Sequence, residues 1–413
     1  MKKLKFKNSY KLIKTDKIDT ILFVFFFPIE CDFRKNNYIK MLDNILCTTN
    51  EEFKEKDDYQ KEALKKCLLS SELNQVRFGN SALIKYKFEI PKENLIKDYN
   101  IFDTFKFAID SLIKADVKDS KFNQNNFDLE KNYLINIYEQ REQNISSSNS
   151  RTLLSIIDYE EKLGLGREHA KEALNSLNNE EMYEYYLKNI KNNKPFIYVY
   201  GDIEESTVSE LFNKFYPLDG SDIEFIKDYV CNIKDVKEDK YEIKTNFNQT
   251  ELDIVYQTEV TEDNYYFLGL VSEFLSSREN DLVFKALRTK HNLVYETNVS
   301  VYPRFGFMYI HALIQDKNIA KAKELIDEIF DNLTNKEKVT EYLNNVNKYI
   351  EYDLLKKQDS LFYEFDNIID DDLELLYLEK VIEKDITVDE VISFVKNIRK
   401  TSEIIFRGKN YED

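Results

Sequence analysis

The chain contains few of the residues that form disulfides and metal sites. Its 413 residues include four cysteines and three histidines. The cysteines form no Cys-x-x-Cys pair and are too few to cross-link a chain of this length, which predicts reduced thiols in the core of a cytoplasmic protein. They are Cys31, Cys47, Cys67 and Cys231. The histidines predict no metal cluster; they are His169 in a loop, His291 in an exposed turn and His311 as a core residue of an apolar strand.

Positive charge and long apolar runs are also scarce. Lys and Arg number 59 against 76 Asp and Glu, which gives a net charge of −17. This balance argues against a nucleic-acid partner, because the phosphate backbone needs clustered Lys and Arg, and is compatible with basic or unstructured peptides as ligands. The apolar run Ile21–Phe27 falls far below the ~20 residues that span a bilayer, so it predicts a buried strand and no membrane contact. Pro28-Ile29-Glu30 after it offers no cleavage site for export.

The length and an internal repeat predict two similar domains. A chain of 413 residues suits two cores of about 200 residues each. The stretch Glu181–Gly201 (EMYEYYLKNIKNNKPFIYVYG) is echoed by Glu390–Gly408 (EVISFVKNIRKTSEIIFRG) half a chain later. Both read as a helix ending in Lys-Asn-Ile, a basic turn and an apolar strand ending in Gly, which indicates a duplicated unit. We place the domains at residues 1–225 and 243–413, joined by a charged linker at 226–242.

Periodicity predicts mixed helices and strands in the first half. The predicted strands are Lys5–Lys14, Thr20–Phe27, Ser81–Ile90 and Phe196–Tyr200. The predicted helices are Asn37–Cys47, Ile101–Ile113, Phe127–Gln143, Glu180–Ile190 and Ile203–Phe215. The segment Asn144–Arg151 (NISSSNSR) is rich in Ser and Asn and predicts a loop.

The segment Phe274–Ile310 is the first candidate for function. Apolar spacing predicts a helix over Val283–Lys290, and a β-branched pattern predicts a strand over Val294–Val301 that pairs with a second strand after a Pro-Gly turn. Arg288 then lies late on the helix and Tyr295 early on the strand. A guanidinium and a phenol converging across this turn would act as fixed hydrogen-bond donors, suited to a carbonyl or an oxyanion.

The same segment resembles a known family. The motif is Leu287-Arg288-x-Lys290-x-x-Leu293-x-Tyr295, preceded by Leu275-Ser276-Ser277 and followed by a strand that begins at Gly306. It resembles the second-domain signature of the pitrilysin and mitochondrial processing peptidase family of zinc peptidases, closest to the bacterial two-subunit branch. The resemblance implies an α+β fold of two homologous domains, each an antiparallel-rich sheet backed by helices, closing like a clamshell. It also implies that Arg288 and Tyr295 reach substrate held at zinc on the first domain or on a partner.

The zinc motif of that family is missing from this chain. Active relatives carry His-x-x-Glu-His on a helix of the first domain, with a further Glu downstream. If Cys47-Thr48-Thr49 marks the end of that helix, the motif positions fall on Tyr38, Met41 and Leu42, and the downstream ligand falls near Ile137. None of these side chains suits zinc. The resemblance therefore implies a chain that has no metal of its own and does not hydrolyse peptides alone.

The sequence thus predicts the non-catalytic subunit of a heterodimeric zinc metallopeptidase. Its partner would be a homologous zinc-bearing subunit, its substrate a peptide, and Arg288 and Tyr295 would assist at the partner's zinc site. The alternative is a peptide-binding or structural pseudoenzyme without a catalytic partner. A third hypothesis, an autonomous hydrolase with another nucleophile, has no Ser, His and Asp set to support it.

Overall fold

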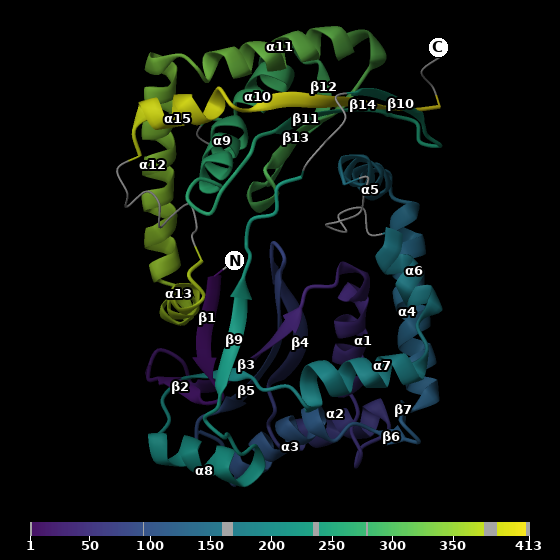
Figure 1. Ribbon diagram of the computed structural model, residues 1–413, viewed down its shortest axis with the longest axis vertical. Helices are drawn as coiled ribbons and strands as arrows, with labels where there is room; N and C mark the ends of the chain where they lie inside the picture. Colours follow the sequence, from purple (N-terminus) through teal and green to yellow (C-terminus); the bar gives the residue numbers. More distant parts are fainter. Residues whose placement is uncertain are drawn as a thin grey trace. The chain divides into compact units, whose positions relative to one another are not determined.

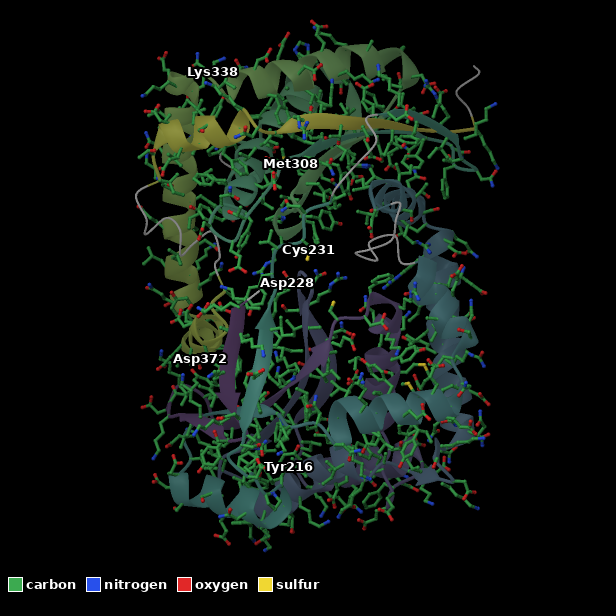
Figure 2. All side chains as sticks on the ribbon, viewed as in Figure 1. Tyr216, Asp228, Cys231, Met308, Lys338 and Asp372 are labelled. Carbon is green, nitrogen blue, oxygen red and sulfur yellow. The ribbon has the colours of Figure 1, made fainter. Side chains whose placement is uncertain are left out.

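The computed structural model describes residues 2–93, 95–158, 168–233, 239–277, 280–375 and 386–409 (Figure 1). These residues form two compact units. The first holds the described residues of 2–151 and 168–228, and the second holds those of 152–158 and 229–409. The chain passes from the first unit to the second after Asp228, which is labelled in Figure 2. The relative placement of the predicted domains, including clamshell closure, stays a prediction.

The first unit is built on a five-stranded sheet of order β2-β8-β3-β5-β4. Only the β2–β8 pair is parallel, and the other three described pairs are antiparallel. The strands are β2 (Tyr10–Ile13), β8 (Phe196–Tyr200), β3 (Thr20–Glu30), β5 (Ser81–Pro91) and β4 (Ser70–Phe78). In β3, Ile21–Phe27 is buried on both faces, which confirms the prediction of a buried strand.

Helices fill the connections of the first half. They are η1 (Phe33–Lys35), α1 (Asn36–Leu46), α2 (Lys56–Lys65), α3 (Ile101–Ile113), α4 (Gln124–Glu142), α5 (Ile145–Ile157), α6 (Glu168–Ser176), α7 (Asn179–Tyr186), η2 (Leu187–Lys191) and α8 (Glu205–Phe215). A short hairpin, β6 (Val117–Lys118) with β7 (Lys121–Phe122), lies between α3 and α4. Aromatic rings join the helices to the sheet: the centroid of Phe105 on α3 lies 5.1 Å from Phe23 on β3 and 5.4 Å from Phe212 on α8. Such edge-on pairs fix the helical layer on one face of the sheet.

The first predicted strand is wrong in one respect. Lys5–Lys14 is two strands, because β1 (Lys2–Lys7) pairs with β9 (Asp222–Lys227) in a separate ribbon while β2 joins the main sheet. The break falls at Asn8, whose side-chain amide donates to the Pro195 carbonyl at 2.9 Å and whose backbone N–H donates to Ser221. The strand pattern continues across this break, so the pattern alone could not reveal it.

The second unit repeats the topology of the first. Its sheet has the order β10-β14-β11-β13-β12, again with one parallel pair, β10–β14. The strands are β10 (Asp239–Lys244), β14 (Arg399–Arg407), β11 (Thr250–Gln257), β13 (Phe307–Ile314) and β12 (Val294–Tyr302). The helices are α9 (Tyr266–Ser276), α10 (Leu282–Phe284), η3 (Lys285–Lys290), η4 (Pro303–Phe305), η5 (Asp316–Asn318), α11 (Ile319–Asn332), α12 (Lys336–Gln358), α13 (Tyr363–Asp372) and α15 (Val388–Val395). The predicted α+β class and the internal duplication are both confirmed.

The glycines that end the two repeated strands have a physical reason. A Cβ on Gly201, after β8, would lie 2.7 Å from the Thr20 carbonyl oxygen, and a Cβ on Gly408, after β14, would lie 2.8 Å from the backbone of Gln249. Both positions therefore exclude any side chain. Gly201 also has φ +142, which favours glycine.

Two further predictions are corrected. Residues 145–151 of the predicted Asn144–Arg151 loop lie in α5. Asn144 caps this helix, because its side-chain oxygen accepts from the Ser147 N–H at 3.0 Å, and Leu153 and Ile157 are buried. The four cysteines are free as expected, yet only Cys231 is buried and the others are partly exposed. Within the described part of the chain, no helix combines the length and the apolar character needed to cross a bilayer.

Candidate functional site

The predicted helix and hairpin of the candidate segment are present. Residues 282–290 form the short helix α10 followed by the π-helix η3, and β12 pairs with β13 in antiparallel register. The turn between the strands needs Gly306, which has φ +71 and whose Cβ would lie 2.4 Å from the Thr258 carbonyl oxygen. π-Helical turns occur often at functional sites.

Arg288 lies in the π-helical turn and is partly exposed. Its Nη1 donates to the Val294 carbonyl oxygen at 2.6 Å and to the side-chain oxygen of Asn292 at 3.1 Å. Asn292 holds a left-handed conformation, φ +49, at the end of the helix. Both contacts use one guanidinium nitrogen, and no described residue accepts from Nε or Nη2. Arg288 thus fastens the turn while two of its nitrogens stay available as donors.

Tyr295 is placed by a β-bulge. Val294 pairs with Ile314 and Glu296 with Leu313, so Tyr295 is the extra residue of β12 with no opposite partner on β13. Bulges re-aim side chains and occur often beside active sites. The Tyr295 side chain is 53% exposed, and its hydroxyl accepts a hydrogen bond from the Gln315 side-chain amide at 2.7 Å. Because that hydroxyl accepts from Gln315, its own proton is left to donate elsewhere.

Arg288 contacts the peptide unit that leads into Tyr295. The carbonyl that Arg288 holds belongs to Val294, and the same peptide unit leads into Tyr295. Among the described strands, β12 lies at the edge of its sheet and pairs only with β13. A cation and a phenol fixed beside an open strand edge can donate hydrogen bonds to the carbonyl of a bound peptide.

The positions predicted for the missing zinc motif are packed into or against the core of the first unit. Met41 and Leu42 on α1 are fully buried, and Ile137 on α4 is a partly buried residue against the same core. Tyr38 is 2% exposed and its hydroxyl donates to the Glu181 carboxylate at 2.9 Å. Burial, then the Glu181 charge, raises the pKa of Tyr38 well above its ordinary value. These residues supply neither imidazole nor carboxylate from α1, so they do not fit a catalytic zinc ion.

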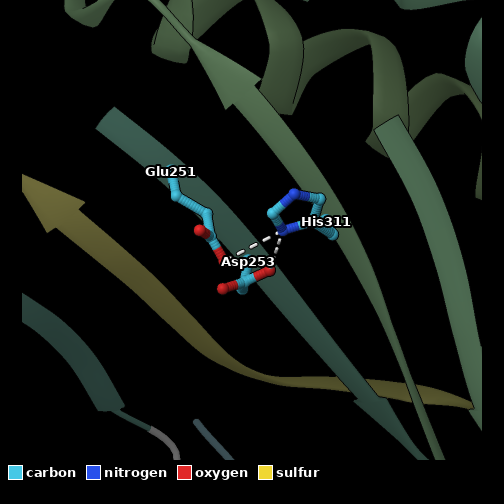
Figure 3. Close-up of side chains that lie close together, drawn as sticks. All are labelled: Glu251, Asp253 and His311. Carbon is cyan, nitrogen blue, oxygen red and sulfur yellow. Dashed lines mark hydrogen bonds and ion pairs between the residues drawn. The ribbon is translucent and has the colours of Figure 1, made fainter. Parts of the chain in front are cut away.

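The structure brings together one group that the sequence analysis missed. Glu251 and Asp253 on β11 meet His311 on β13, and all three are buried (Figure 3). His311 Nδ1 lies 2.9 Å from Glu251 Oε1 and 3.2 Å from Asp253 Oδ1. Burial opposes the charged imidazolium, but hydrogen bonds to both carboxylates outweigh it and raise the pKa of His311. Burial raises the pKa of Asp253, partly offset by His311.

The sequence carried one signal for this group. Glu251 and Asp253 alternate with Leu252 and Ile254 in β11, which places two acids on one face of a buried strand. Their third member could not be found, because His311 lies 58 residues further along the chain than Asp253. The expected burial of His311 and exposure of His291 are confirmed, and the side chain of His169 lies outside the described residues.

Comparison with known proteins identifies the family. Residues 176–346 match the model for the peptidase M16 inactive domain. A probable inactive metalloprotease, YmfF of Bacillus subtilis (strain 168), is 21% identical over 237 residues, which cover 56% of this chain and 53% of that protein. The match thus spans about half the length of this curated relative. The chain is a metallopeptidase-like protein of the M16 family.

Solved structures agree with this M16 assignment in fold. A conserved protein from Enterococcus faecalis V583 superposes with a TM-score of 0.83 at 17% identity, covering 98% of this chain and 97% of its own. The periplasmic protease PqqL from Escherichia coli superposes with a TM-score of 0.66 at 11% identity, covering 97% of this chain and 46% of its own. The family predicted from Arg288, Tyr295 and their neighbours is confirmed, and the coarser function, an inactive M16-type peptidase-like protein, is supported.

Proposed function

We propose that this M16-family chain is the non-catalytic subunit of a heterodimeric zinc metallopeptidase. Arg288 and Tyr295 donate hydrogen bonds to the substrate carbonyl while a homologous partner subunit carries the zinc. The observation that carries the proposal is the bulge at Tyr295, an exposed phenol with an available proton that directly follows the carbonyl held by Arg288. A residue needed only for packing would not require this placement.

The positions of the lost zinc motif support the need for a partner. Tyr38, Met41 and Leu42 are core residues of α1, so a peptidase reaction requires a metal supplied from outside this chain. The length of PqqL also supports a second subunit. PqqL is a protease, and the part that matches this chain covers 46% of it. A second M16-type chain would bring the assembly to that size.

The sheet edges of the second unit suit an extended peptide. β12 has one neighbour, β13, so its outer edge can hydrogen-bond the main chain of a ligand with little demand on sequence. The net charge of −17 favours basic or unstructured peptides. With the carbonyl of such a peptide polarised by the partner's zinc, Arg288 and Tyr295 stabilise the negative charge that develops on its oxygen. The four free cysteines are consistent with work in the cytoplasm.

The test is reconstitution. This chain is co-expressed with a homologue of similar length that carries His-x-x-Glu-His, ideally one encoded beside it. Peptide cleavage is then measured for each chain alone and for the purified pair. We expect cleavage by the pair, none by this chain alone, and a large loss of turnover in Arg288→Ala and Tyr295→Phe pairs. Unchanged turnover in both variants would remove the two residues from the mechanism.

One observation favours a second candidate, a peptide-binding or structural pseudoenzyme with no catalytic partner. The Nη1 contacts of Arg288 with Val294 and Asn292 stabilise the turn, and this alone would give Arg288 a structural reason to be present. In that case Arg288→Ala lowers the thermal midpoint, and Tyr295→Phe changes neither stability nor peptide affinity. The effect of Tyr295→Phe therefore distinguishes the two candidates: the variant loses turnover in the first and is unaffected in the second.

A further inference from the structure

A buried triad of metal-ligating side chains lies in the second unit, apart from the Arg288 and Tyr295 segment. Glu251, Asp253 and His311 each offer one ligand atom, and these three atoms lie within 4.8 Å of one another. The side chains are 2%, 1% and 8% exposed. Figure 3 shows all three reaching toward one point between β11 and β13.

The backbone holds this triad rigidly. β11 is the central strand of the sheet, hydrogen-bonded to β14 on one side and β13 on the other, and Asp253 is directly opposite His311 in the register. Glu251 lies two residues before Asp253, so both carboxylates leave β11 on the same face. The ligand geometry is therefore set by a sheet and needs no loop to close on it.

The charges of the three side chains do not cancel one another. Two carboxylates and one imidazolium sum to one negative charge, and burying charge is costly. A divalent cation with a neutral imidazole and two carboxylates sums to zero. One oxygen is also unsatisfied: Asp253 Oδ2 is buried and accepts no hydrogen bond from any described residue. Buried polar atoms without partners are rare and point to a missing ion or water.

The spacing fits a first-row transition metal. With metal–ligand bonds of about 2.0–2.1 Å, the donors of a tetrahedral site lie about 3.3 Å apart. His311 Nδ1 lies 2.9 and 3.2 Å from its two carboxylate oxygens, close to that edge length. Imidazole with carboxylates is a zinc-type donor set, whereas calcium and magnesium take oxygen ligands.

We propose that Glu251, Asp253 and His311 bind one zinc ion that stabilises the second unit. The ion joins β11 to β13 and neutralises the two carboxylates, with the remaining Asp253 oxygen or a water as the fourth ligand. Because the three side chains are buried, this site does not handle substrate. The proposal concerns the fold of this chain and does not rest on the proposed peptidase function.

The experiment uses the full chain alone, without partner or substrate. Metal is removed with a chelator, the protein is dialysed against micromolar Zn²⁺, and bound zinc is measured by elemental analysis. We expect about one zinc ion per chain, with a thermal midpoint that rises with zinc concentration by mass action. Asp253→Asn and His311→Gln should lower zinc affinity on the order of 100-fold. The matched control is His291→Gln, since His291 is exposed and outside the triad, and it should bind zinc as the wild type does.

A second measurement keeps the test decisive if a triad variant fails to fold. Co²⁺ in place of Zn²⁺ gives the wild-type chain visible absorption typical of a tetrahedral site with a nitrogen ligand. No zinc uptake and no such Co²⁺ spectrum in the wild type would overturn the proposal, as would full uptake by a folded His311→Gln variant. Arg288→Ala and Tyr295→Phe chains should take up zinc normally. A failure of the zinc proposal therefore leaves the proposed peptidase function standing, and a failure of the peptidase function leaves the zinc proposal standing.

Discussion

Removing the hydroxyl of Tyr295 is the perturbation that best separates function from structure. In the second unit this hydroxyl has one described contact, with the Gln315 side chain at 2.7 Å, and the ring is 53% exposed. Tyr295→Phe keeps the ring and the β-bulge and deletes only the donor. Arg288→Ala is less clean, because it also deletes the contacts that fasten the turn.

The expected losses of stability and of rate in Tyr295→Phe follow from the environment of the hydroxyl. A neutral hydrogen bond contributes about 0.5–1.5 kcal/mol to stability, and this one is exposed, so we expect at most about 1 kcal/mol of destabilisation. That corresponds to a thermal midpoint lower by roughly 2–4 °C in a domain of this size. A donor aimed at a developing oxyanion contributes about 10²–10³ in kcat, or about 2.7–4 kcal/mol. The predicted loss of rate therefore exceeds the predicted loss of stability.

The assay is kcat and KM of the reconstituted pair on a quenched fluorescent peptide, alongside the thermal midpoint of this chain. Tyr295→Phe should lower kcat and kcat/KM together, because the interaction forms only in the transition state. The matched control is Tyr352→Phe, since Tyr352 is 56% exposed on α12. Gln315→Ala removes the contact but keeps the hydroxyl, and should cost far less rate. A Tyr295→Phe pair with wild-type kcat would refute the reasoning.

Three further predictions test the fold. Burial opposes the charge of Glu403, but Lys323 at 2.6 Å, with Lys240 and Lys400, outweighs burial and lowers its pKa. Its stabilisation is thus fully present above the ordinary Glu pKa of 4.5 and is lost as pH falls through the lowered pKa. Thermal melts of Glu403→Gln should show destabilisation at pH 7 that shrinks as pH falls below the ordinary Glu pKa, and a constant difference would contradict this. Gly201→Ala should destabilise by at least about 1 kcal/mol in urea titrations, because its Cβ would overlap a carbonyl oxygen. Gly269→Ala, in the interior of α9 with its nearest contact at 4.0 Å, should instead stabilise by about 0.5–1 kcal/mol; equal effects of the two substitutions would show that the close approach at Gly201 is unimportant.

Local pattern predicted those parts of the fold that depend on neighbours in sequence. The α3 helix over Ile101–Ile113 has the predicted bounds, and the hairpin after Arg288 forms where β-branched residues and Gly306 predicted it. The pattern failed where a long-range contact overrides it. Lys5–Lys14 divides at Asn8 because Asn8 bonds to Pro195 and Ser221, which lie far along the chain.

For the candidate site, the residues were predicted from the sequence, and their placement was visible only in the structure. Arg288 and Tyr295 could be chosen from a motif, since they lie seven residues apart on adjacent elements. The bulge that turns Tyr295 outward arises only from the register of β12 against β13, which no local pattern encodes.

By itself, the sequence determined the duplicated α+β architecture, the M16-type motif and the absence of His-x-x-Glu-His, because periodicity, repeats and residue identity are local properties of a chain. Only the tertiary structure decided that Glu251 and Asp253 share a buried point with His311. The physical reason is the pairing of β11 with β13, which places side chains far apart in sequence opposite each other in one sheet.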